Sequence, residues 1–244
     1  MKATLDYILH LADNALILGQ RNAEWCGHGP VLEQDIAISN ISLDLIGQAR
    51  SFYQYAAEIK GNGTTEDDLA YLRDERQFKN ILLVEQPKGD WGFTVLRQFL
   101  FSAHQQWLFQ QLSTHDDERL AAIAEKSLKE VNYHLRWSSE WVIRLGDGTE
   151  ESRQRILNAI ETMWTFTGEM FMGEAFETAS GVNVQVGLPA WEEKVRNCFA
   201  EANLEVPANV FMRSGGKKGM HSEHLGFILA EMQYLQRSYP GCEW

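Results

Sequence analysis

An all-helical fold is predicted for this 244-residue chain, and three observations support it. Apolar residues recur every three or four positions over long segments, which is the spacing of one face of an α-helix. Only five prolines occur in the whole chain. No segment alternates apolar and polar residues for long enough to be a convincing strand. We therefore predict a long antiparallel four-helix bundle with additional C-terminal helices, forming one domain over residues 1–244.

The first three predicted helices cover residues 3–25, 31–59 and 67–85. The first ends before Gly27 and Pro30, in the segment WCGHGP, because glycine and proline interrupt helices. The second ends at the polar segment GNGTTEDD, and the third leads into the turn PKGDWG. The apolar positions of the second helix lie on one face: Ile38, Ile41, Leu45, Ala49, Phe52, Ala56 and Ile59.

Three further helices are predicted over residues 92–113, 117–145 and 152–179. Each of the first two has a regular apolar stripe, as expected for a helix that packs against neighbours on one side. Thr149 or Ser152 is a suitable N-cap for the third, because a hydroxyl oxygen accepts hydrogen bonds from the first free amides of a helix. The first four long helices, over residues 3–25, 31–59, 92–113 and 117–145, each have more than 20 residues and are about 30 Å or more long, which suits an antiparallel bundle.

The rest of the chain is predicted to contain short helices over residues 190–202 and 221–238. The segment GVNVQVGL, residues 181–188, is the one candidate strand, and we predict a loop there. The aromatic and methionine-rich segment ETMWTFTGEMFMGEAF, residues 161–176, is typical of core, and an adaptable interface is the alternative.

Composition restricts the possible classes of function. The formal net charge is −12, which argues against broad binding to nucleic acid or anionic membranes. Cys26, Cys198 and Cys242 are odd in number and form no metal-binding or disulfide pattern, which indicates reduced thiols. Asp6 and Asp13 interrupt the N-terminal apolar pattern, so no signal peptide is predicted, and no apolar run reaches the ~18 residues of a membrane span. We expect a soluble cytoplasmic protein.

The segment KEVNYHLRW resembles part of a metal site and can be tested by its spacing. Helix-bundle di-iron proteins use a Glu-x-x-His pair on each of two helices and a glutamate on each of the other two. Here Glu130 precedes His134 by four residues, and the residue three before His134 is Val131. The carboxylate position that would face the bundle interior together with His134 is therefore occupied by valine.

The other long helices also lack the required ligands. Leu45 and Gln48 occupy the corresponding core positions of the second helix, and neither side chain carries a ligand charge. No Asp or Glu occurs from Trp91 through His115. We therefore predict no catalytic residue and no metal centre in this chain, with Leu45, Gln48, Val131 and His134 as degenerate ligand positions.

Two alternatives for the remaining polar residues stay open. Glu130 and His134 can contact each other one helical turn apart, as a boundary hydrogen bond. They can also form part of a mononuclear zinc site, completed by His221 or His224, in an independent metal-binding oxidoreductase. A capping role for Ser222 and a packing role for His224 are the simpler interpretation of the HSEH segment.

The segment RSGGKKG, residues 213–219, is the most basic short stretch of an acidic chain. Glycines allow a backbone to approach an anion, and a helix N-terminus favours negative charge. Arg213, Lys217 and Lys218 are therefore candidates to contact the phosphates of a ligand or the acidic groups of a partner. A solvated loop is the alternative.

Several long segments, in order along the chain, carry a resemblance to a known family. NAEWCGHGP, LDLIGQARSF, LRDERQFKNILLVEQP, KEVNYHLRW and RSGGKKGMHSEHLG resemble segments of the C subunits of bacterial ring 1,2-phenylacetyl-CoA epoxidases, which belong to the ferritin-like proteins. The similarity covers nearly the whole chain, although no single motif is decisive.

The resemblance implies a ferritin-like fold and a role in aerobic phenylacetate degradation. In that system a sister A subunit holds the di-iron centre and epoxidises the ring of phenylacetyl-CoA with oxygen and electrons from an NADPH-dependent reductase. The C subunit is implied to be a structural subunit without its own cofactor, which pairs with the A subunit and stabilises it. Contact of Arg213, Lys217 and Lys218 with the CoA ester is a further possibility, and a CoA-binding module that acts without the A subunit is another.

Overall fold

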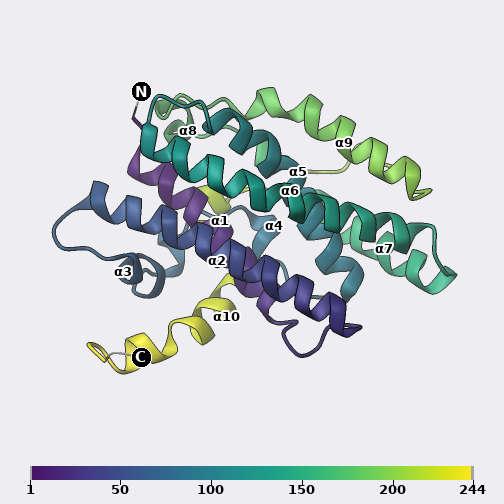
Figure 1. The fold of residues 1–244 in the computed structure, drawn as a ribbon, viewed down its shortest axis with the longest axis horizontal. Helices are drawn as coiled ribbons and strands as arrows, with labels where there is room; N and C mark the ends of the chain where they lie inside the picture. Colours follow the sequence, from purple (N-terminus) through teal and green to yellow (C-terminus); the bar gives the residue numbers. More distant parts are fainter. Residues whose placement is uncertain (1, 243–244) are drawn as a thin grey trace. The chain divides into compact units, whose positions relative to one another are not determined.

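The computed structural model describes residues 2–242, and all regular structure within this range is helical (Figure 1). The predicted all-α fold class is confirmed. The chain forms two compact units: residues 88–214 form the inserted unit, and residues 3–87 with residues 215–242 form the split unit. The prediction of one domain over residues 1–244 stays a prediction. No helix of the described residues is long and apolar enough to cross a membrane.

The split unit is built on a hairpin of two helices, α1 (Leu5–Ala23) and α2 (Leu32–Lys60), which pack along each other. α1 begins where the hydroxyl of Thr4 accepts a hydrogen bond from the amide of Tyr7 at 3.2 Å. The helices approach closely at Gly19, where an added Cβ would lie 3.2–3.4 Å from atoms of α2. Both helices were predicted to within about two residues at each end.

The predicted helix over residues 67–85 is wrong. The chain instead forms α3 (Glu66–Tyr71), one 3-10 turn at Glu75–Gln77 and the short α4 (Leu82–Glu85). The intervening backbone is held by α1 rather than by helical hydrogen bonds. The amide of Lys79 donates to the Asp13 carboxylate at 2.8 Å, and the amide of Ile81 donates to Asn14 Oδ1 at 2.9 Å. Polar side chains of α1 thus replace the helical partners of these amides.

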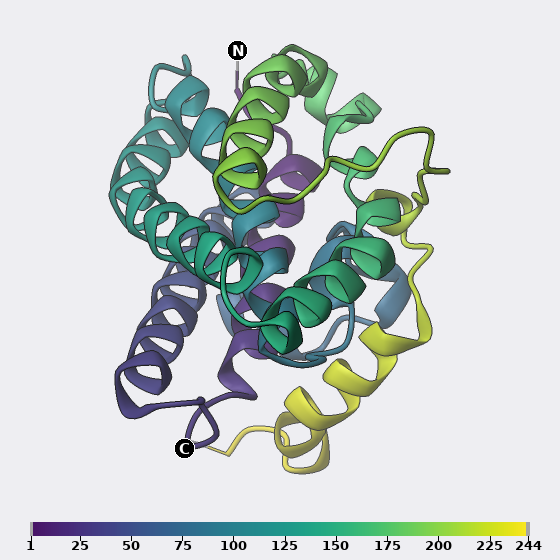
Figure 2. The ribbon, with the colours of Figure 1, turned by 90° about the vertical axis from the view of Figure 1, so that its right-hand side faces the viewer.

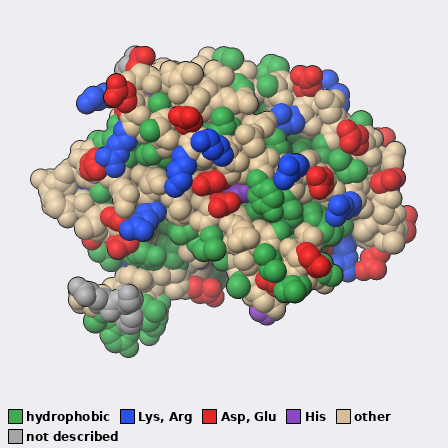
Figure 3. Space-filling model, in the orientation of Figure 1, with side chains coloured by type: hydrophobic (Ala, Val, Ile, Leu, Met, Phe, Trp, Pro, Cys, Tyr) green, Lys and Arg blue, Asp and Glu red, His purple; other side chains and the backbone are tan. Residues whose placement is uncertain are grey.

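The C-terminal part of the split unit contains α10 (Glu223–Met232) and α11 (Tyr234–Ser238). Ser222 occupies the N-cap position of α10, but its side chain makes no capping hydrogen bond, contrary to its predicted role. The side-chain amide of Gln233 donates to the carbonyl oxygens of Ala70 and Arg73 at 3.2 and 3.0 Å. Hydrophobic side chains gather on the outer surface of α10 and α11 (Figure 3), where Phe227 and Tyr234 are exposed.

The inserted unit is built on a second hairpin, α5 (Trp91–Leu112) and α6 (Glu118–Gly146). Against both helices lie α7 (Glu150–Met163) and α9 (Leu188–Glu201) (Figure 1, Figure 2). Three N-caps start the first three of these helices, and each accepts a hydrogen bond from the amide three residues later: Asp90, Asp117 and Thr149. Two long helical hairpins are the components that a ferritin-like bundle requires.

The predicted helix over residues 152–179 is also wrong in its second half. α7 ends at Met163, and two 3-10 turns follow at Trp164–Phe166 and Gly168–Phe171 before α8 (Ala175–Ala179). The chain leaves the helix because Thr165 bonds to a distant segment. Its hydroxyl donates to the carbonyl of Phe211 at 2.6 Å, and its carbonyl accepts from the amide of Arg213 at 2.7 Å. The predicted loop at residues 181–188 includes a 3-10 turn, Val184–Gly187.

Candidate functional site

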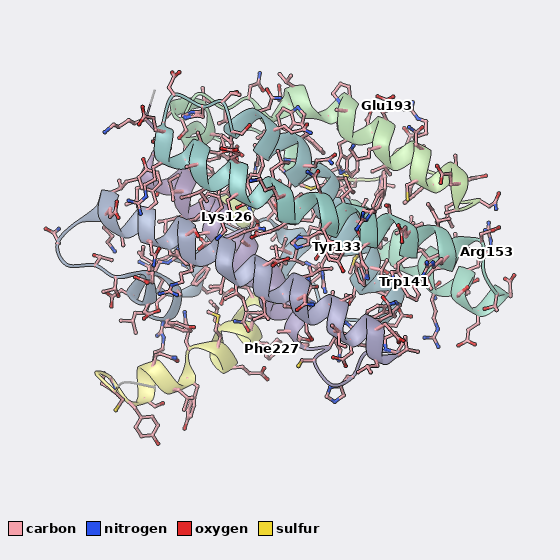
Figure 4. All side chains as sticks on the ribbon, viewed as in Figure 1. Lys126, Tyr133, Trp141, Arg153, Glu193 and Phe227 are labelled. Atoms are coloured by element: carbon pink, nitrogen blue, oxygen red, sulfur yellow. The ribbon has the colours of Figure 1, made fainter. Side chains whose placement is uncertain are left out.

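The degenerate ligand positions of α6 lie in its buried face. Val131 is 2% exposed and His134 is fully buried. The two residues, three positions apart, therefore lie on the same face of the helix, as their spacing predicts. Glu130 is half-buried. Tyr133 lies on a more exposed side of α6, with 38% exposure, and is labelled in Figure 4. The valine side chain supplies no carboxylate at the position where a glutamate ligand would be required.

The corresponding positions of α2, Leu45 and Gln48, are 2% and 4% exposed. Neither a leucine nor a glutamine fits a di-iron centre, whose charge is balanced by carboxylates. Within residues 2–242 no three His, Cys, Asp or Glu side chains are grouped closely enough to hold a metal ion. The side chains of Leu45, Gln48 and Val131 lack the carboxylates that a di-iron group needs, and the absence of a metal centre from this chain stays a prediction.

One buried polar cluster of the split unit surrounds Glu85, at the end of α4. This side chain is fully buried, and its two carboxylate oxygens accept three hydrogen bonds. The donors are Asn80 Nδ2 at 2.8 Å, His221 Nδ1 at 2.8 Å and the backbone amide of Ser222 at 2.6 Å. These four residues, here called the Glu85 cluster, attach the start of α10 to the first 87 residues of the chain.

His221 is positioned by hydrogen bonds on both ring nitrogens. Nδ1 bonds to Glu85 and Nε2 lies 3.0 Å from the carbonyl oxygen of Phe78, so both nitrogens face acceptors. Burial lowers the pKa of His221, but the hydrogen bond and charge of Glu85, the Phe78 carbonyl and the more distant Asp13 together raise it above the ordinary 6.5. Both ring nitrogens are engaged in hydrogen bonds, so a zinc ion at His221 would have to replace one of these two bonds.

A second buried ionic network lies beside this cluster in the split unit. The Asp13 carboxylate accepts from both terminal nitrogens of Arg73, from the Tyr53 hydroxyl at 2.6 Å and from the Lys79 amide. Burial lowers the pKa of Arg73, but the interactions with Asp13 and Tyr53 outweigh burial and raise the pKa above its ordinary value. The guanidinium therefore stays charged. Burial, followed by the Asp13 charge, raises the pKa of the Tyr53 phenol well above its ordinary value.

The basic segment RSGGKKG is divided between the two units. Arg213 and Lys218 are exposed, whereas Lys217 is only 3% exposed. The glycines of the segment allow a close approach to the chain's own backbone: an added Cβ at Gly216 would lie 2.2 Å from the carbonyl oxygen of Asn80. At Gly219, which has a φ of +75°, it would lie 2.2 Å from the carbonyl oxygen of Arg76. Of the three predicted anion contacts, two present their side chains to solvent.

Sequence reasoning missed both buried networks of the split unit. A signal was present in each case, because Asp13 and Glu85 are acidic residues within apolar helical patterns, where an unpaired charge is costly. Their partners could not be identified from the sequence, since Arg73 and His221 lie 60 and 136 residues away. His221, one of the two histidines considered for completing a zinc site, bonds to Glu85 in the structure.

Comparison with known proteins places these features in a family. A family model described as "Phenylacetic acid catabolic protein" matches residues 1–244. The chain is 50% identical over 243 residues to a protein of Escherichia coli (strain K12) that is described as the C subunit of 1,2-phenylacetyl-CoA epoxidase. The alignment covers 98% of each chain, so the similarity extends over both units.

Proposed function

This chain belongs to the phenylacetic acid catabolic protein family, and on that premise we propose that it is a non-catalytic structural subunit of a multicomponent phenylacetyl-CoA epoxidase in the cytoplasm. The observation that carries the proposal is the occupation of buried ligand positions by Leu45, Gln48 and Val131. Their side chains cannot balance the charge of two iron ions in a low-dielectric interior.

Its partner in this proposal is the catalytic A subunit of the epoxidase, which holds the di-iron centre, together with the other epoxidase components. Iron ligands lose catalytic geometry when their supporting helices shift by about 0.5 Å, so a rigid neighbour contributes to activity without touching the substrate. The two buried ionic networks of the split unit support this role, because they attach the backbone at Lys79 to α1 and the start of α10 to α4.

Elemental analysis of the purified chain, expressed in medium supplemented with iron and zinc, tests the metal-free part of the proposal. We expect well below about 0.1 equivalent of either metal, because a stable site needs a complete set of charged ligands. Val131→Glu serves as the matched variant and is expected to remain iron-free, since Leu45 and Gln48 still lack ligand charge. About one or two equivalents of metal, lost in His134→Ala, would instead establish the alternative, an independent metal-binding oxidoreductase.

Arg213 and Lys218 are proposed to lie at the edge of the complex, where they contact acidic groups of the A subunit or the phosphates of the CoA ester. Both side chains are exposed on a chain with a net charge of −12, which supports an electrostatic role. Lys218→Glu is expected to slow association with the A subunit by about tenfold at low salt and by less at high salt. Lys126→Glu, which changes an exposed lysine of α6, is the control in the same kinetic measurement (Figure 4).

A further inference from the structure

A cavity of about 360 Å³ lies wholly within the inserted unit. Its walls come from the two 3-10 turns after α7, from α9 and from residues 206–212. The volume falls in the range of about 300–1,000 Å³ that is typical of small-molecule sites. None of the degenerate metal positions or of the basic segment's lysines lines it, so this cavity is separate from the features considered above.

Three aromatic side chains form the inner wall. The ring centroids of Trp164 and Trp191 are 5.7 Å apart, and those of Phe171 and Trp191 are 5.3 Å apart. The indole N–H of Trp191 donates to the carbonyl oxygen of Leu100 on α5 at 3.0 Å, which fixes the central ring of the three. Rigid aromatic surfaces of this kind bind planar apolar groups at little entropic cost.

The outer wall is also held in place. Met212 lies against Gly168, where an added Cβ would be 2.6 Å from Met212 Cγ, so the glycine provides the space that the methionine fills. The two hydrogen bonds of Thr165, to Phe211 and Arg213, anchor the backbone on either side of Met212. The cavity is therefore formed before any ligand enters, which reduces the cost of binding.

Two charged side chains of α9 line the rim of the cavity. Arg196 on α9 lines the same cavity, is exposed and forms no ion pair within the described part of the chain. One acidic residue, Glu192, lies one helical turn before Arg196. A guanidinium without an ion-pair partner favours an acceptor group with negative charge over a cation.

We propose that this cavity binds a small aromatic carboxylate. The aromatic ring stacks within the wall formed by Trp164, Phe171 and Trp191, and the carboxylate bonds to Arg196. Glu192 opposes the carboxylate and lowers its affinity, because the two negative charges share one rim of the cavity. This site goes beyond the structural role proposed above, since binding to it requires neither the A subunit nor a metal.

Isothermal titration of the full chain with 2-naphthoate tests the proposal. We expect saturable binding at one site per chain, with a Kd of about 0.1–1 mM. Arg196→Gln is expected to weaken binding about fivefold through loss of a charge-assisted hydrogen bond at the rim. Glu192→Gln is expected to tighten it about threefold, and Glu193→Gln on the same helix, outside the cavity lining, is the matched control with unchanged affinity (Figure 4).

Two further measurements make the result decisive. Val206→Trp fills the cavity from a position that is 42% exposed, so the variant is expected to fold, as checked by circular dichroism, and to lose binding. Benzyltrimethylammonium is the oppositely charged probe, and an aromatic wall beside a carboxylate can also hold such a cation. Absence of saturable 2-naphthoate binding, equal affinity in Arg196→Gln, or preferential binding of benzyltrimethylammonium would each overturn the proposal.

Discussion

Replacing Asp13 with alanine is expected to lower the free energy of unfolding of the split unit by about 3–5 kcal/mol. The substitution leaves the buried guanidinium of Arg73 without its carboxylate, and Arg73 has only 8% of its side chain exposed. It also leaves the Tyr53 hydroxyl and the Lys79 amide without their acceptor. Because one side chain satisfies donors from three other segments, its loss has a larger effect than that of an ordinary ion pair. Urea denaturation followed by circular dichroism measures the change.

Two variants control for this result. Tyr53→Phe removes the hydroxyl that donates to Asp13 and accepts from Arg73, but it leaves the Asp13–Arg73 pair in place, and it is expected to cost about 2 kcal/mol. Asp6→Ala removes a carboxylate of the same helix whose ion pair with Lys79 is largely exposed, with Asp6 54% exposed, and should change stability little. If Asp13→Ala and Asp6→Ala gave equal losses, the buried network would not be the stabilising element described here.

Replacing Glu85 with alanine is expected to release the start of α10 from the rest of the split unit. The substitution leaves Asn80, His221 and the Ser222 amide without their shared acceptor, which is expected to cost about 3 kcal/mol. The effect should be local, because the packing of α1 against α2 and the Asp13 network do not involve the Glu85 side chain. Hydrogen exchange is expected to show lost protection in residues 223–232, whereas α5 and α6 keep theirs.

The same cluster makes stability depend on pH, with a defined sign. The pKa of His221 in the folded chain is raised above 6.5, the ordinary value that it regains on unfolding. The stabilisation is therefore fully present below pH 6.5 and is lost as the pH rises through the folded-state pKa. Asp13 and Glu85 are the acidic groups that favour the charged ring, and burial opposes them. Protection of α10 should fall as the pH increases across this window.

His221→Gln provides the comparison for this pH effect. Glutamine keeps a donor for Glu85 but does not titrate, so the difference in unfolding free energy between the two proteins should shrink as the pH increases from about 6 to about 9. A difference that stays constant, or grows, would show that the histidine is neutral in the folded chain. The comparison cancels the contributions of thiols and other groups that titrate in the same range.

The long helices could be predicted from the sequence because their stability comes from regular apolar faces. Residues 31–59 were expected and Leu32–Lys60 is observed, and residues 92–113 were expected and Trp91–Leu112 is observed. The predictions over residues 67–85 and 152–179 failed where hydrogen bonds to distant segments replaced helical hydrogen bonds. Asp13 and Asn14 bond to the amides of Lys79 and Ile81, and Thr165 bonds to Phe211. A local pattern contains no information about such partners.

The candidate site divides in the same way. The absence of a carboxylate at Val131 could be read from residue type and helical phase, because both are local properties. The cavity beside Trp164 could not be predicted, because it depends on a broken helix and on residues 206–212 meeting α9. The interpretation of RSGGKKG was incomplete for a related reason: its glycines are explained by the carbonyls of Asn80 and Arg76, which the sequence alone does not place nearby.

The interrupted chain path of the split unit has a consequence for how the protein is made. A ribosome releases residues 3–87 first, but Glu85 receives His221 only after a further 136 residues have been synthesised. By then residues 88–214, which form the inserted unit, have all been synthesised, so this unit can fold while translation continues. Until then the split unit cannot complete its core, and the apolar faces of its first helices stay exposed to aggregation. Slowing translation is therefore expected to prolong the aggregation-prone interval rather than to improve folding yield.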